Sequence, residues 1–146
     1  MPIFQASMEF VATLACAIFA GAALYINLVE HPARMTCGTE IAVRQWAPSY
    51  KRATWMQAPL AIVGFLCAVL AWRAGSSIWW LMGGILLGLV VPLTFAVIMP
   101  TNKRLLSPNL DQRSEETQQL LEKWNQLHGV RSGLSTIALI IFLLHP

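Results

Sequence analysis

Long apolar runs alternate with short polar segments along this chain of 146 residues. Residues 10–29 form the first run, which only Thr13 and Asn27 interrupt, and residues 56–72 and 78–99 form two more. A helix that crosses roughly 30 Å of hydrocarbon needs about 20 mostly apolar residues. The pattern therefore predicts membrane-spanning helices in all three runs, the second being the shortest.

A fourth span is predicted near the end of the chain, where an amphipathic segment precedes the apolar run 130–144. Ser114 is a suitable N-cap for a helix there, and Glu115 and Glu116 suit the positive end of the helix dipole. Apolar residues then recur at helical spacing. One helix is therefore expected to begin in water and to enter the bilayer. The prediction is a single four-span domain over residues 1–146, with spans at about 8–30, 56–73, 78–99 and 114–145.

The connections between the runs complete the predicted fold. Residues 30–55 are polar, and Pro32 and Pro48 exclude one unbroken helix through them. A short interfacial helix is expected at residues 41–46. The connection 73–77 is so short that the second and third spans must form an antiparallel hairpin. The predicted fold class is all-α, an antiparallel four-helix bundle in the membrane with a cytoplasmic amphipathic extension of the fourth helix.

Composition and charge also place the protein in a membrane. Hydrophobic residues make up 56% of the chain, charged residues 12%, and the mean hydropathy is +0.57, whereas soluble domains carry about 25% charged residues. All lysines and arginines except Arg73 lie in the first loop or between residues 103 and 131. The positive-inside rule predicts that the first and third loops are cytoplasmic and that both termini lie outside. Because topology accounts for the basic charge, no nucleic-acid partner is expected.

Polar residues gather at the predicted cytoplasmic ends of the spans. Asn27 and His31 are four residues apart, which places them on one helix face. Trp124, His128 and Arg131 step along one face of the fourth helix. Antiparallel helices bring these groups to one end of the bundle, where they form a candidate pocket for a flat amphipathic substrate. The candidate catalytic residues are His128, His31, Arg131 and Asn102, and the candidate substrate-binding residues are Trp124, Asn27, Arg34 and Tyr50.

Each candidate also has a purely structural interpretation. Arg34 is suited to be an orientation signal and membrane anchor, His31 to cap the end of the first span, and Trp124 to pack between helices. The three histidines lack metal-site spacing, and no metal site is predicted. Haem or copper held by His31 and His128 stays an open alternative, with Cys37 as the only nearby thiol. The chain contains no nucleotide-binding loop, nucleophile elbow or HExxH motif.

Several segments together carry a resemblance to a known family. They are residues 21–34, which end in Glu-His-Pro-Ala-Arg, and residues 46–52, 92–94, 99–105 and 124–131. In this order they resemble the anthrone-oxygenase-like family of small four-span membrane proteins, many of whose members have no assigned function. Each segment is a weak signal alone, but the ordered set spans most of the chain.

The resemblance implies conversion of an anthrone to an anthraquinone by molecular oxygen, without an obvious cofactor. A general base removes a proton from the acidic methylene group of an anthrone, and the resulting enolate reacts with oxygen. On this hypothesis His128 or His31 is the base. Arg131 and Asn102 stabilise the enolate oxygen, and Trp124 stacks on the ring system. No cofactor is predicted.

The main functional prediction is a membrane-embedded oxygenase or oxidoreductase that acts on a lipophilic, anthrone- or quinol-like aromatic. The alternatives are a non-enzymatic membrane module that binds a lipophilic ligand or a partner protein, and a haem- or metal-binding bundle. No span carries a charge at mid-membrane, so a channel or transporter is less well supported. The expected partners are a lipophilic small molecule and the lipid bilayer, and small residues in the spans favour a homo-oligomer.

Overall fold

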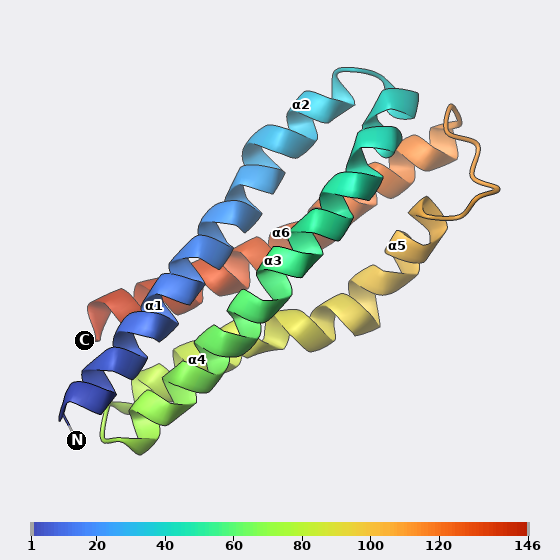
Figure 1. The fold of residues 1–146 in the computed structure, drawn as a ribbon. Helices are drawn as coiled ribbons and strands as arrows, with labels where there is room; N and C mark the ends of the chain where they lie inside the picture. Colours follow the sequence, from blue (N-terminus) through green and yellow to red (C-terminus); the bar gives the residue numbers. More distant parts are fainter. Residues whose placement is uncertain (1, 146) are drawn as a thin grey trace.

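Four long helical segments make up the computed structural model, which describes residues 2–145 (Figure 1). They are Pro2–Met35, Thr39–Arg73, Ile78–Leu105 and Glu115–Leu144, and each is long and apolar enough to cross a membrane. The shortest has 28 residues, or about 42 Å at 1.5 Å per residue, against roughly 30 Å of hydrocarbon. The predictions of an all-α four-helix bundle and of an integral membrane protein are confirmed, and each of the four segments is longer than the minimum needed to cross the hydrocarbon layer.

Two of the long segments contain a π-helical turn. The first consists of α1 (Pro2–Tyr25), η1 (Ile26–Glu30) and α2 (His31–Met35), and the third of α4 (Ile78–Leu93), η2 (Thr94–Ile98) and α5 (Met99–Leu105). In each, the N–H after the π turn donates to a carbonyl five residues earlier. Each π turn ends two residues before a proline, Pro32 or Pro100. A proline lacks an N–H and crowds the carbonyl four residues back, and the wider turn relieves this conflict.

The prediction of a separate interfacial helix at residues 41–46 is wrong, because these residues belong to α3 (Thr39–Arg73). The prolines at positions 48 and 59 lie inside this continuous helix, with Pro48 on its exposed side. Residues 30–55 are nevertheless not one helix. The break falls at residues 36–38, where Gly38 has a φ of 87° that favours glycine.

The helices form an antiparallel bundle in which α1 packs against α3 and α6 (Glu115–Leu144), and α4 packs against the same two helices. The termini and the turn between α3 and α4 lie at one end (Figure 1). The connections 36–38 and 106–114 lie at the other, which we call the loop end. The predicted hairpin of spans two and three is therefore confirmed. Ser114 is also confirmed as the N-cap of α6, because its Oγ accepts the Thr117 N–H at 3.2 Å.

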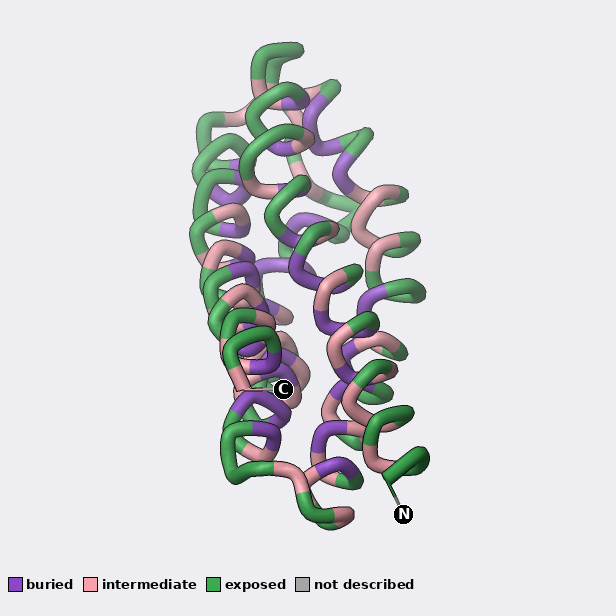
Figure 2. The backbone as a smooth tube through the Cα atoms, turned by 90° about the vertical axis from the view of Figure 1, so that its left-hand side faces the viewer, coloured by how far each residue is buried: buried purple, intermediate pink, exposed green. Residues whose placement is uncertain are grey.

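The interior consists of two apolar clusters with a polar layer between them. Buried residues occur along the whole length of the bundle (Figure 2). One cluster, near the termini, includes Phe19 and Leu87, and the other, near the loop end, includes Trp46 and Leu121. Along α6, the cluster residues end at Trp124 and resume at Ala138, with buried polar residues in the interval. This polar layer holds His128, with Asn27 and Arg131 beside it, and it adjoins Trp124 of the loop-end cluster.

Candidate functional site

His128 is the centre of the polar layer, and its side chain is held by Asn27 of η1, in the neighbouring helical segment. Its ring is 2% exposed, and Nδ1 lies 2.8 Å from Asn27 Oδ1. The amide of Asn27 donates to the backbone carbonyl of Asn125 at 2.9 Å. A carbonyl oxygen only accepts hydrogen bonds, so this contact fixes which end of the Asn27 carboxamide carries the NH₂ group. Asn27 Oδ1 must therefore face His128.

The orientation of Asn27 determines the tautomer of His128. Nδ1 donates to Asn27 Oδ1, so in the neutral ring the proton resides on Nδ1 and the lone pair on Nε2. Ser132 Oγ donates to the same Asn27 oxygen at 2.5 Å. The imidazole is thereby held with Nε2 as its free basic nitrogen.

A small internal cavity of about 10 Å³ adjoins His128. A cavity of roughly this size holds at most about one water molecule, so an aromatic ring system does not fit there. Three of the predicted site residues besides His128 line the cavity. Its lining comprises Ile26, Ser49, Tyr50, Ala53, Thr54, Gln57, Trp124, His128 and Arg131.

Arg131 reaches the same cavity one helical turn further along α6. Its Nη2 donates to Gln57 Oε1 at 3.0 Å, and its guanidinium carbon lies 5.4 Å from the centre of the Phe19 ring. Arg131 Nε and Gln57 Nε2 are buried without a hydrogen-bond partner. The guanidinium is thus positioned by neutral groups, and no carboxylate among the described residues forms an ion pair with it.

The indole of Trp124 lies against both histidines. Its ring centre is 4.9 Å from that of His128 and 5.5 Å from that of His31. Trp46 contacts Trp124 edge-on at 5.6 Å and stacks on Tyr50 at 5.1 Å. These aromatic contacts make a rigid wall on the loop-end side of the cavity.

His31 lies behind this wall and does not line the cavity. Both of its ring nitrogens are buried without a hydrogen-bond partner. The adjacent carboxylate of Glu30 pairs with Arg34 instead, at 2.5 Å. Between the two candidate bases, only His128 combines a fixed tautomer with access to a cavity.

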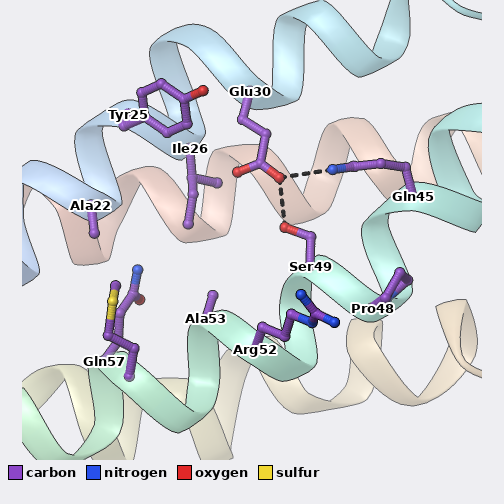
Figure 3. Close-up of a pocket in the computed structure, with 11 residues that line it drawn as sticks. Ala22, Tyr25, Ile26, Glu30, Gln45, Pro48, Ser49, Arg52, Ala53 and Gln57 are labelled. Atoms are coloured by element: carbon purple, nitrogen blue, oxygen red, sulfur yellow. Dashed lines mark hydrogen bonds between the residues drawn. The ribbon is translucent and has the colours of Figure 1, made fainter.

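Arg34 and Asn102 are buried but stand outside the cavity. Glu30 Oε1 accepts hydrogen bonds from Arg34, from Ser49 at 2.6 Å and from Gln45 at 2.9 Å, and Figure 3 shows the last two contacts. Both polar atoms of the Asn102 side chain lack a partner. The structure therefore brings together Asn27, Tyr50, Trp124, His128 and Arg131, with His31 adjacent to Trp124, and holds Arg34 and Asn102 apart.

Sequence reasoning missed Gln57 and Ser132, which both contact the residues it selected. Gln57 is a carboxamide near the start of an otherwise apolar run, and polar residues inside a span commonly face the bundle interior. Ser132 follows His128 by four residues on the same helix face. Those two signals were present in the sequence.

No group of three or more His, Cys, Asp or Glu side chains among residues 2–145 is arranged to hold a metal ion. The open alternative of a haem or copper site rests on His31 and His128, whose rings both contact Trp124. The absence of a cofactor stays a prediction.

The fold and the site define a class, the small four-helix membrane proteins with a histidine in a polar layer between apolar clusters. Residues 46–141 match the family described as anthrone oxygenase, and the chain belongs to this family. The matched range contains Tyr50, Trp124, His128 and Arg131 and leaves out Asn27. No match was found among curated proteins or among solved structures. The resemblance recognised in the sequence is thereby confirmed.

Proposed function

We propose that this protein is an oxygenase that converts the acidic methylene group of an anthrone-like substrate to a ketone with molecular oxygen. Membership of the family supports oxygenase-type chemistry. The observation that carries the specific proposal is the hydrogen bond from His128 Nδ1 to Asn27, which leaves Nε2 as the basic nitrogen beside a small cavity. The substrate is lipophilic and is taken from the bilayer.

In the first step, His128 Nε2 removes a proton from the methylene carbon. The electron pair of the broken C–H bond enters the ring system and gives an enolate. Asn27 Oδ1 continues to accept the Nδ1 hydrogen bond and so stabilises the positive imidazolium. The Arg131 guanidinium, which lines the same cavity, stabilises the negative charge that develops on the enolate oxygen.

In the second step, the enolate reacts with dioxygen and a carbon–oxygen bond forms at the former methylene carbon. Loss of the second C–H proton and cleavage of the O–O bond then give the ketone and hydroxide. The hydroxide takes the proton held by His128 and leaves as water. One oxygen atom ends in the ketone and the other in water, so the four electrons lost by carbon reduce one dioxygen molecule.

The remaining candidates take different places in this proposal. Trp124 and Tyr50 line the cavity and form its aromatic wall beside His128. His31, Arg34 and Asn102 receive no direct role, because none of them lines the cavity.

The test is oxygen consumption by the detergent-solubilised protein with anthrone as substrate. Replacement of a general base lowers the rate about 100-fold or more, so His128→Ala should reduce kcat by at least this factor. His31→Ala is the matched control, because it removes a second buried histidine that contacts the same tryptophan, and it should leave kcat close to the wild-type value. Full activity of a correctly folded His128→Ala protein would disprove the proposed role.

A further inference from the structure

A long groove runs along the outside of the bundle between α1–η1 and α3 (Figure 3). Its volume is about 660 Å³, within the range of about 300–1,000 Å³ typical of small-molecule sites. Glu30, Gln45 and Ser49 gather at one end, while Ala22 and Gln57 lie at the other (Figure 3). The groove is therefore amphipathic along its length, as a site for a flat ring system with polar substituents needs to be.

The groove and the His128 cavity are separated by a single layer of side chains. Ile26, Ser49, Ala53 and Gln57 line both spaces. Ile26 belongs to the π turn η1, and π turns are frequent at functional sites because they interrupt the regular helical hydrogen bonds. A molecule in the groove thus lies one side chain away from the cavity of His128, and this wall has to shift before the molecule meets Nε2.

Within this wall, Gln57 is the residue whose side chain has a polar group without a hydrogen-bond partner. Its side chain is 1% exposed, and its Oε1 accepts the hydrogen bond from Arg131. Its Nε2 is buried without a partner. A buried NH₂ group without an acceptor is unfavourable, and rotation of the carboxamide toward the groove would let a ligand oxygen satisfy it.

Size together with the position of Gln57 decides where the ring system lies. The His128 cavity of about 10 Å³ is too small for it. A second pocket, between α3 and α4, also adjoins Arg131, but its volume is about 110 Å³. Gln57 does not line that pocket. Both the larger volume and the unsatisfied amide therefore favour the groove between α1 and α3.

We propose that the groove between α1 and α3 is the binding site of the planar aromatic substrate, and that Gln57 Nε2 donates a hydrogen bond to a ring oxygen. This inference rests on the proposed function for the identity of the substrate. The Gln57 carboxamide then connects substrate and Arg131, because its other end already accepts from the guanidinium. Gln57 is a substrate-binding residue that fixes the ring next to the cavity of His128.

The groove is tested by ligand binding to the full-length protein in detergent. The probe is 1,8-dihydroxyanthraquinone, and quenching of tryptophan fluorescence reports its Kd. Ala22→Phe fills the groove, and Ala58→Phe fills the pocket between α3 and α4, since each alanine lines only one of these two spaces. The first variant should raise Kd about tenfold or more, while the second should stay within about twofold. The reverse pattern would place the ligand between α3 and α4 and overturn the proposal.

Folding of both variants is checked by their melting temperatures. If Ala22→Phe does not fold, Met56→Trp provides a second obstruction, because Met56 lines the groove from α3 and is 47% exposed. It should also raise Kd, and an unchanged Kd in this variant would contradict the proposal.

The role of Gln57 is tested with a pair of ligands. Gln57→Met keeps the length of the side chain and removes the donor, and loss of one hydrogen bond weakens binding about tenfold. Binding of 1,8-dihydroxyanthraquinone should weaken by this factor, whereas anthracene, which has no oxygen, should bind as to the wild type. Gln57→Glu keeps an acceptor for Arg131 but has no NH₂ group, and should weaken the quinone in the same way. Equal effects on both ligands, or none, would contradict a hydrogen bond from Gln57.

The outcomes for the groove and for the proposed function are distinguishable. If Ala22→Phe abolishes ligand binding but the wild type consumes no oxygen with anthrone, the binding site in the groove is supported and the oxygenase function is contradicted. If Ala22→Phe turns over anthrone with an unchanged KM, the oxygenase function is supported and the groove as substrate site is contradicted.

Discussion

At the scale of single residues, the carboxamide of Asn27 organises the site. It makes four hydrogen bonds to α6: two to Asn125, one to Ser132 and one to His128. Glu30 lies nearer to a histidine in the sequence but pairs with Arg34. A neutral acceptor thus orients the imidazole, and this suits an apolar setting, where an unpaired carboxylate would be costly.

This arrangement predicts that Asn27 acts through the orientation of His128. Asn27→Leu removes the acceptor of the Nδ1 hydrogen bond and should lower kcat about 10- to 100-fold, as loss of a group that orients a functional histidine does. Asn27→Asp keeps an acceptor and should recover part of the loss in the oxygen-consumption assay.

Ser132→Ala is the control for this experiment. It removes another hydrogen bond to the same Asn27 oxygen and leaves the contact with His128 in place. Its kcat should stay near the wild-type value. If Ser132→Ala and Asn27→Leu reduce kcat equally, general loss of packing explains the effect, and orientation of His128 does not.

At the scale of the elements, small residues allow the helices to approach closely. A Cβ atom on Gly84 of α4 would lie 2.8 Å from the Ala68 Cβ of α3. Neither atom is at the end of a flexible side chain, so the two helices would have to move apart. Gly133 of α6 has no atom within 4 Å of the corresponding position. Gly84 and Gly133 both lie within helices, so they differ in the atoms that surround each position.

Alanine at these two positions should have opposite effects on stability. Gly84→Ala forces α3 and α4 apart and should destabilise the protein by about 1–3 kcal/mol. Gly133→Ala meets open space and should stabilise it by up to about 1 kcal/mol through helix propensity. Melting temperatures in detergent measure both changes. A fall of equal size in the two variants would show that contact with Ala68 is not the cause.

At the scale of the whole molecule, the bundle separates a loop end from an end that carries both termini (Figure 1). Positive charge gathers near the loop end, where Arg113 also pairs with Glu40 of α3 at 2.6 Å. The positive-inside rule predicts that the loop end is cytoplasmic. The hydrocarbon layer then surrounds the middle of the helices, and the polar layer lies inside the bundle.

Cysteine labelling in intact cells tests this orientation. Cys37 is exposed at the loop end, while Cys16 is buried and Cys67 is partly buried. A membrane-impermeant maleimide should label Cys37 only after permeabilisation. In a Cys37→Ser background, Ser77→Cys at the opposite end should be labelled in intact cells, because Ser77 is exposed in the turn between α3 and α4. Labelling of Cys37 in intact cells would reverse the predicted orientation.

Local sequence is sufficient for much of this description. Apolar runs predict the four helices, because a bilayer requires a minimum length of apolar helix. Helical periodicity also places Trp124, His128 and Arg131 on one face, since residues three and four apart are neighbours on any helix. Ser114 as N-cap and the family relationship depend likewise on residues that are close together in the chain or in a fixed order.

Contacts between helices were decided only by the tertiary structure. Asn27 and His128 are separated by 101 positions in the chain, and Gln57 and Arg131 by 74. Their meeting depends on how far each helix is rotated and shifted against its neighbours, and the π turn that contains Asn27 changes that rotation. For the same reason Asn102 lies outside the cavity. The pair of Arg34 and Glu30 is instead local, because the two residues are four apart on one helical segment. A helix carries its own periodicity, but the face that it presents to another helix is settled by the packing of the whole bundle.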